Sequence, residues 1–157
     1  DYEKFIVGNM MLELLLKTNR PLQANEILFI NSLKGLNLLA NDNVNEKILL
    51  LKFMLGLLKV NGFRLNFSRC NTCNMPYVNK IFLNLMMGEF ECGSCKSDYS
   101  VIVEKEVFSL LKKINSLEIT NLDDVTEEDK VVINAINLLC LNIEHRFNIK
   151  INSKSYF

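Results

Sequence analysis

Two pairs of cysteines carry the clearest chemistry in this sequence. Cys70 and Cys73 form one Cys-x-x-Cys pair, Cys92 and Cys95 form a second, and eighteen residues separate the two pairs. A tight turn over two intervening residues can bring both sulfurs of a pair to one side, and four thiolates match the tetrahedral preference of zinc. The spacer also lies within the range that is typical of paired-cysteine zinc sites. We therefore predict that Cys70, Cys73, Cys92 and Cys95 bind one zinc ion.

A site made of four cysteines is closed, which indicates a structural ion. Catalytic zinc keeps one position open for water or substrate and usually has histidine or carboxylate ligands. The alternative is four free thiols or two redox-active pairs. A redox pair normally accompanies a strand–helix–strand unit, and the sequence shows no such unit. The ion is expected to hold together a small hairpin-rich unit that lacks the apolar area to fold alone.

The remaining reactive residue types do not indicate an enzyme. His145 is the only histidine and lies near the end of a predicted helix, where it can interact with the helix dipole. Cys140 lies in an apolar run and is expected to be a small core residue. The glycines lack the spacing of a phosphate-binding loop. A protein without catalytic residues is the expectation.

Length and composition fit one globular domain, or one domain with a small insert. The chain has 157 residues, of which 49% are apolar, enough for a substantial core. Five cysteines without a signal peptide argue for the reducing cytoplasm, where paired cysteines more often bind metal than form disulfides. No apolar run reaches the length of a membrane span, so we expect no membrane contact.

Charge is balanced overall but unevenly distributed. A formal net charge of zero does not by itself indicate a nucleic-acid-binding protein. However, the interval from Lys52 to Lys80 contains five basic residues and no acid, a second basic stretch closes the chain, and the acids cluster at 123–129. One interpretation is ordinary solvated charge. The other is a face that contacts DNA phosphates, built from Arg64, Arg69, Lys80 and Lys154.

Helical spacing of apolar residues predicts the elements that must position the cysteines. Helices are expected over 3–17, 23–40, 46–61 and 104–117 and from about Thr126 to Phe147, because Thr126 and Asp129 resemble a capping box. In the third of these helices, ten of the thirteen positions from Ile48 to Val60 are apolar, which indicates a central helix. The exceptions form one narrow stripe, made of Lys52, Gly56 and Lys59.

Two finer expectations concern the second and third helices. Ile27, Ile30, Leu33 and Leu38 are predicted to supply the buried face of the second helix. Gly56 in the third helix either permits a close backbone approach or is simply tolerated.

The segment between the third and fourth helices carries the cysteines. Residues 81–90 alternate in part between apolar and polar, which predicts a strand, a turn and a strand. The predicted fold is therefore mainly α: a single domain over 1–157, a bundle of about five helices, with a zinc ribbon of small hairpins inserted at 63–103.

Three segments resemble one family, the bacterial RecO recombination mediators. The run FMLGLLKVNGFRLNFSRCNTC (53–73) resembles the family's apolar helix that leads through a glycine and an aromatic residue into the first cysteine pair. GEFECGSC is similar to its glycine-preceded second pair, and the terminal NSKSYF resembles its Lys-Ser-aromatic ending. Two departures occur: Asn74 follows the first pair where the family often has glycine, and Glu89 follows Gly88 where the family often has a second glycine.

The resemblance implies a DNA repair and recombination function without catalysis. RecO proteins begin with an OB-fold barrel, for which this chain has no room, so the chain resembles their helical, zinc-bearing C-terminal part. The family implies binding and annealing of DNA, a RecR-like partner, the acidic and apolar C-terminal tail of single-strand-binding protein, and a cytoplasmic, nucleoid-associated location. Two alternatives remain: a zinc-ribbon scaffold of another nucleic-acid-associated assembly, and an enzyme that uses a cysteine pair as a dithiol.

Overall fold

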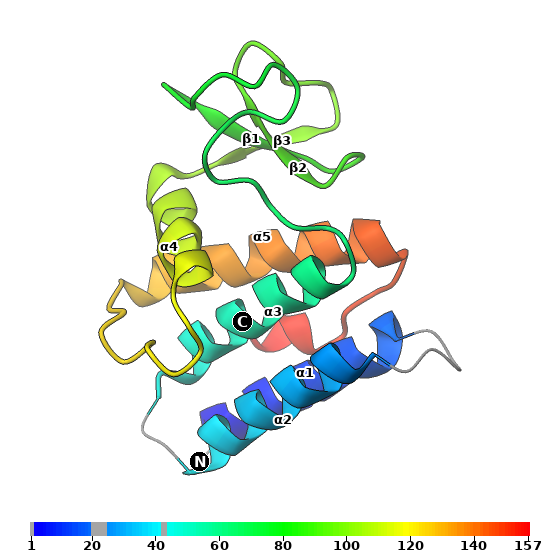
Figure 1. Cartoon of the computed structure of the whole chain (residues 1–157), viewed down its shortest axis with the longest axis vertical. Coiled ribbons are helices and arrows are strands. Elements are labelled where there is room, and N and C mark those ends of the chain that lie inside the picture. The colour runs from blue at the N-terminus through cyan, green and yellow to red at the C-terminus, as the bar shows by residue number, and fades with distance from the viewer. Residues whose placement is uncertain (1, 20–24, 42–43) are drawn as a thin grey trace.

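The computed structural model describes residues 2–19, 25–41 and 44–157, and Figure 1 shows a layer of helices with a small sheet above it. The described residues form five α-helices, and the sheet lies between the third and fourth of them in chain order, as predicted. A short 3₁₀ helix follows the fifth helix near the C-terminus. The elements are α1 (Tyr2–Thr18), α2 (Glu26–Asn41), α3 (Glu46–Val60), β1 (Ile81–Asn84), β2 (Glu89–Cys92), β3 (Ser100–Val103), α4 (Lys105–Ser116), α5 (Asp129–Phe147) and η1 (Ser153–Tyr156).

Helix α3 is the central element, as its sequence predicts. It contacts α1, α2, α4 and α5, and nine of its side chains are buried. Its first turn is capped by the Asn45 side chain, which accepts hydrogen bonds from the backbone N–H groups of Lys47 and Ile48, each 3.1 Å long. The less apolar stripe is confirmed, because Lys59 is exposed and Lys52 and Gly56 are half-buried.

Two residues of that stripe have different roles. A Cβ atom on Gly56 would meet no neighbouring atom, so the close backbone approach considered for this glycine is wrong. Lys52 instead reaches the end of α4, where its Nζ donates to the carbonyls of Ile114 (3.1 Å), Asn115 (3.4 Å) and Leu117. A cation suits the unpaired carbonyls at a helix C-terminus. Lys52 therefore joins α3 to α4.

The structure corrects the predicted face of α2. The buried residues are Leu28, Ser32, Gly35 and Leu39. Of the predicted residues, Ile27, Ile30 and Leu33 are exposed, and Leu38 is half-buried against the core. The middle of this face consists of the small residues Ser32 and Gly35, and α1 lies close to the glycine: a Cβ atom on Gly35 would be 2.8 Å from Met11 Cε. The predicted start of this helix at residue 23 lies outside the described residues.

The start of α5 also differs from the prediction. The helix begins at Asp129 with Glu128 as its N-cap, and no side chain caps it, so the proposed capping box of Thr126 and Asp129 is wrong. The preceding loop is anchored by Val125, which is buried and whose N–H donates to Leu122 O at 3.0 Å. Asp129 instead pairs with Lys47 across to α3, at 2.6 Å.

The sheet has three antiparallel strands in the order β2-β1-β3. The predicted strand, turn and strand over 81–90 are confirmed as β1 and β2, while β3 pairs with the other edge of β1. Ile81, Leu83, Phe90 and Val103 are buried on one face of the sheet, and Phe82, Asn84 and Glu91 are buried on the other. No helix in the described part of the chain is long and apolar enough to cross a membrane.

Candidate metal centre

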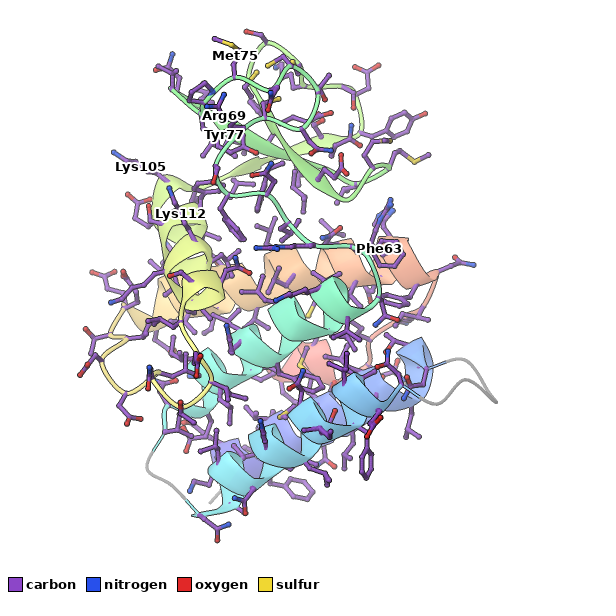
Figure 2. All side chains as sticks on the ribbon, in the orientation of Figure 1. Phe63, Arg69, Met75, Tyr77, Lys105 and Lys112 are labelled. Atoms are coloured by element: carbon purple, nitrogen blue, oxygen red, sulfur yellow. The ribbon has the colours of Figure 1, made fainter. Side chains whose placement is uncertain are left out.

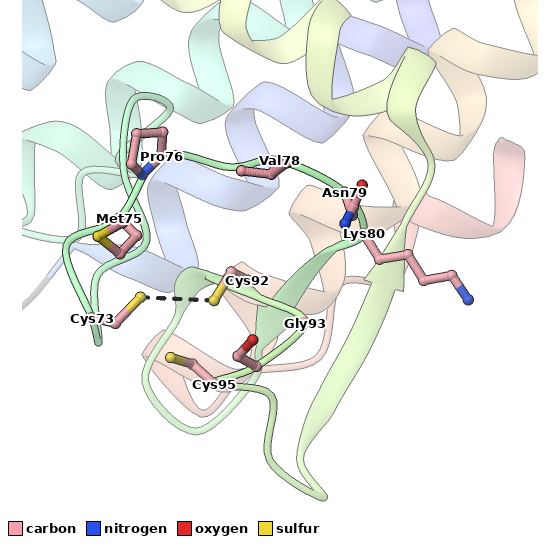
Figure 3. Close-up of a pocket in the computed structure, with 10 residues that line it drawn as sticks. Cys73, Met75, Pro76, Val78, Asn79, Lys80, Cys92, Gly93 and Cys95 are labelled. Atoms are coloured by element: carbon pink, nitrogen blue, oxygen red, sulfur yellow. Dashed lines mark hydrogen bonds between the residues drawn. The ribbon is translucent and has the colours of Figure 1, made fainter.

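The four predicted ligands lie together in the segment that we call the cysteine module, residues 63–103. Cys70 and Cys73 come from the loop before β1, Cys92 ends β2, and Cys95 lies in the next turn. All four Sγ atoms lie within 4.8 Å of one another, and Cys73 Sγ is 3.8 Å from Cys92 Sγ (Figure 3). A tetrahedral ion with zinc–sulfur bonds of about 2.3 Å holds its sulfurs about 3.8 Å apart. The cluster is therefore able to hold a metal ion.

The first cysteine pair lies in a tight backbone turn. Cys70 N donates to Met75 O and Asn74 N donates to Cys70 O, both at 2.8 Å. Asn74 has a φ of 59°, in the left-handed region that asparagine tolerates better than most residues. This conformation explains why a glycine or an asparagine suits the position after the first pair.

The second pair meets the first through backbone donors. Cys92 N donates to Cys70 Sγ at 3.3 Å, and Cys95 N closes its own turn onto Cys92 O at 3.1 Å. Burial raises the pKa of Cys70, but backbone N–H groups of Cys73, Cys92 and Thr72 outweigh it and lower the pKa to about 6. These donors thus favour a thiolate, the form that binds metal.

The pKa of Cys95 is shifted in the opposite direction from that of Cys70. Hydrogen bonds with Cys73 and Cys92 raise the pKa of Cys95 to about 12. Neighbouring thiols resist becoming four thiolates at once because like charges repel. A bound cation would remove this repulsion, so the cluster has the electrostatics of a cation site.

An aromatic cluster attaches the cysteine module to α4. The rings of Phe67, Phe90 and Phe108 lie 5.1 to 5.4 Å apart between centroids. Tyr77 packs edge-on against Phe108, and its hydroxyl donates a hydrogen bond to the carbonyl of Arg69 at 2.7 Å. Figure 2 labels Tyr77 and Arg69, which lie above α4. Aromatic pairs of this kind contribute about 0.5–1.5 kcal/mol each beyond burial. The loop, β2 and α4 therefore form one packed unit.

A second attachment joins the β1–β2 turn to α5. Arg146 Nη2 donates to Leu85 O at 3.0 Å and also to Met86 O. Gly88 has a φ of 68°, and a Cβ atom there would lie 2.5 Å from Arg146 Cδ. Glycine is therefore required at this position both by conformation and by space.

Sequence reasoning missed the polar residues that support the cysteines. Arg146 belongs to the basic stretch that closes the chain, and the sequence indicates no role for Asn84 or Glu91, which are both buried. The strand reads Glu-Phe-Glu-Cys, so Glu91 alternates with Phe90 and Cys92 as an exposed acid would, and the sequence carries no signal of its burial. Hydrophobic periodicity does not reveal a buried acid.

The predicted phosphate-contacting residues lie in different environments. Arg69 Nη1 donates to Asn74 O at 3.2 Å beside the first cysteine pair, and Lys80 precedes β1. Arg64 follows α3 and lines a pocket of about 360 Å³ with Asn115. Lys154 in η1 forms an ion pair with Glu144 at 2.6 Å. Three of the four therefore belong to the cysteine module, and Lys154 belongs to the C-terminal tail.

A surface groove of about 1020 Å³ lies beside the cysteine cluster (Figure 3). It combines cysteine loops with exposed apolar side chains and one lysine. Its lining residues include Met75, Val78, Lys80, Ser94 and Cys95. Met75 is 61% exposed and Val78 is 83% exposed, so the groove offers apolar contact next to a positive charge.

Comparison with known proteins gives one consistent result. Residues 1–150 match the family described as "Recombination protein O C terminal". A protein named DNA repair protein RecO from Streptomyces griseus is 29% identical over 120 residues, covering 74% of this chain and 47% of that protein. Its namesake from Streptomyces avermitilis is 30% identical over 115 residues, covering 71% of this chain and 45% of that protein.

A third relative is similar along the whole sequence. DNA repair protein RecO from Clostridium novyi is 22% identical over 157 residues, covering 100% of this chain and 61% of that protein. This chain thus spans about half the length of the curated relatives it matches.

Proposed function

Because this chain belongs to the RecO recombination-protein family, whose C-terminal part it matches over residues 1–150, we propose that it acts in DNA repair and recombination. Its role is that of a mediator, which binds DNA and protein partners during strand annealing and recombinase loading. The family match is the observation that carries this function. A non-catalytic role agrees with Cys140, whose burial raises its pKa to about 12 and keeps it a protonated thiol.

The metal that fits the cysteine cluster best is zinc, held as one structural ion by Cys70, Cys73, Cys92 and Cys95. Thiolate ligands in a tetrahedral set favour zinc over harder metals. The proximity of all four sulfurs, within 4.8 Å of one another, supports a shared ion over two separate redox pairs. The ion would order the loops of a zinc ribbon and leave no open position for substrate.

Metal analysis tests the zinc assignment. The purified chain should contain about one zinc, because four thiolates complete the tetrahedral set. Cys70→Ser should lose most of the metal, while Cys140→Ala, which removes a thiol far along the sequence, should keep it. Protein prepared without chelator that contains no zinc, or equal zinc loss in both variants, would contradict the assignment.

The proposed DNA contact uses the basic residues of the cysteine module. Arg64, Arg69 and Lys80 can neutralise phosphates, whereas Lys154 can reach one only by giving up its ion pair with Glu144. Phosphate contacts carry no base identity, so binding should show little sequence preference. Without base readout the affinity should be that of non-specific binding, micromolar or weaker.

Fluorescence anisotropy with labelled duplex DNA across a salt series tests this contact. Three neutralised phosphates predict a slope of about −3 for log affinity against log salt, since each contributes roughly 0.9. Arg69→Glu should weaken binding to every sequence and flatten the slope by about one. Lys34→Glu on α2, which lies on the side of the helical part opposite the sheet (Figure 1), is the matched control and should bind like the parent. Parental binding by Arg69→Glu would rule out this surface.

Protein partners are proposed from the family resemblance. They are a RecR-like protein and the acidic, apolar C-terminal tail of single-strand-binding protein. Such a tail needs an apolar groove with a cationic rim. We propose that it binds the helical part of the chain, where α2 exposes the apolar side chains of Ile27, Ile30 and Leu33. Calorimetry with the tail peptide should show heat that weakens as salt rises, and absence of heat at millimolar peptide would contradict the proposal.

A further inference from the structure

We propose that Glu91 is a positioning residue of the metal centre, whose buried carboxylate holds the loops of both cysteine pairs in ligating geometry. The proposal rests on the proposed function of the four cysteines as metal ligands. Glu91 lies on β2 directly before Cys92 and is only 5% exposed. A buried carboxylate is costly unless several donors satisfy it, so the partners of Glu91 show what the position is used for.

The first partner comes from the loop of the first cysteine pair. Thr72 lies between Cys70 and Cys73, and its Oγ1 donates to Glu91 Oε1 at 3.3 Å. The same loop meets β2 a second time, where Asn71 N donates to Phe90 O at 3.3 Å. One side-chain bond and one backbone bond therefore fix this loop along β2.

Two further partners connect Glu91 to the loop of the second pair. Ser100 Oγ donates to Glu91 Oε2 at 2.9 Å and accepts from Ser97 N at 3.0 Å. Asn84 Nδ2 donates to Glu91 Oε1 at 2.9 Å and to Ser97 Oγ at 3.3 Å. Ser97 lies two residues after Cys95. The carboxylate thus links the segments that carry both pairs, and neutral donors occupy both its oxygens.

The strand register explains why Glu91 can do this without binding the ion itself. Glu91 pairs with Phe82 on β1, and Asn84 pairs with Ser100 on β3. Because side chains alternate along a strand, Glu91, Asn84 and Ser100 share one face of the sheet, whereas Cys92 belongs to the other. The carboxylate therefore supports the loops from the face opposite the Cys92 sulfur.

Removing this support should weaken metal binding specifically. Partners that orient metal ligands typically account for a 10- to 100-fold change in metal affinity. Glu91→Ala should therefore raise the zinc dissociation constant by about tenfold or more. Glu91→Gln should stay close to the parent, because its amide oxygen can accept from Thr72 and Asn84 while its NH₂ group donates to the Ser100 hydroxyl.

Competition with a chromophoric chelator, on the whole chain, measures these dissociation constants. Cobalt substitution supplies a second readout, since absorption bands of tetrahedral cobalt thiolates report ligand geometry. We expect altered cobalt bands in Glu91→Ala and parental bands in Glu91→Gln. Glu106→Ala, an exposed glutamate on α4, is the matched control and should retain parental affinity. Ser100→Ala removes one of the three hydrogen bonds to Glu91, together with the contacts of Ser100 with Ser97. It should give an intermediate loss of zinc affinity, which provides a result if Glu91→Ala does not fold.

The outcomes separate this proposal from the metal assignment. If the parent binds no zinc, that result contradicts both the metal assignment and the positioning role of Glu91. If the parent binds zinc but Glu91→Ala and Ser100→Ala bind it as tightly, the positioning role alone is overturned, even where the thermal stability of the zinc-free protein drops. Loss of zinc by Glu91→Gln equal to that of Glu91→Ala would overturn it too, because the hydrogen-bond geometry would then not be what matters.

Discussion

A single carboxylate on α1 holds the C-terminal tail in place. Glu13 accepts hydrogen bonds from Asn152 N at 2.8 Å, from Ser153 N at 2.9 Å and from the Ser153 hydroxyl, and it pairs with Lys17 at 2.6 Å. The N–H groups at the start of a helix otherwise lack partners, so Glu13 caps η1 from another helix. Burial raises the pKa of Glu13, but these bonds outweigh it and lower the pKa to about 2.

The depressed pKa predicts a pH dependence of stability. Because the folded pKa of about 2 lies below the ordinary value of 4.5, the stabilisation by Glu13 is fully present above pH 4.5 and is lost as pH falls towards 2. Glu13→Gln should therefore be less stable than the parent at pH 7, and this difference should shrink as pH falls through that window. Urea unfolding of both proteins at pH 7, 5 and 3 measures it.

Comparing parent and variant cancels contributions that both share, including protonation of the cysteines. Glu106→Gln on α4 serves as the control and should show no such convergence. A stability difference between Glu13→Gln and the parent that stays constant from pH 7 to pH 3 would show that the Glu13 charge does not hold the tail.

At the scale of elements, the sequence predicted those structures whose signals are local. The almost continuous apolar run of α3 predicts a central helix, and the cysteine spacing by itself predicts the cluster. The buried face of α2 was not predictable from apolar residues, because it depends on how closely α1 approaches Gly35. Strand β3 has only four residues and gains its structure from pairing with β1.

The contacts that join elements were beyond the reach of local patterns. Lys52 bonds to carbonyls more than sixty positions later in the chain, and Arg146 bonds to carbonyls about sixty positions earlier. In the sequence both residues look like ordinary surface cations, and only the packing of helices against one another shows what they bind. The same holds for Glu91, whose role depends on strand register and on two loops.

At the scale of the whole molecule, the helices bury a much larger apolar core than the cysteine module does. The helical layer has a core drawn from α1, α3 and α5, including the fully buried Met10, Leu49 and Ile136. The sheet has only twelve residues in its strands, and two of its buried side chains, Asn84 and Glu91, are polar. A unit this small generally needs a metal or a disulfide to fold, so the module should depend on its ion while the helices should not.

Metal removal tests this division. Structural zinc sites contribute on the order of 10 kcal/mol of folding free energy, so excess chelator should loosen residues 63–103 and leave the helices folded. Hydrogen exchange read by mass spectrometry should show β1 and β2 losing protection while α1, α3 and α5 keep theirs. Cys70→Ser without chelator should reproduce the pattern, and Cys140→Ala without chelator should not. Simultaneous loss of protection in α3 and α5 would instead show that the module and the helices fold as one cooperative unit, joined through the Phe67–Phe108 contact and the Arg146 bonds to the β1–β2 turn.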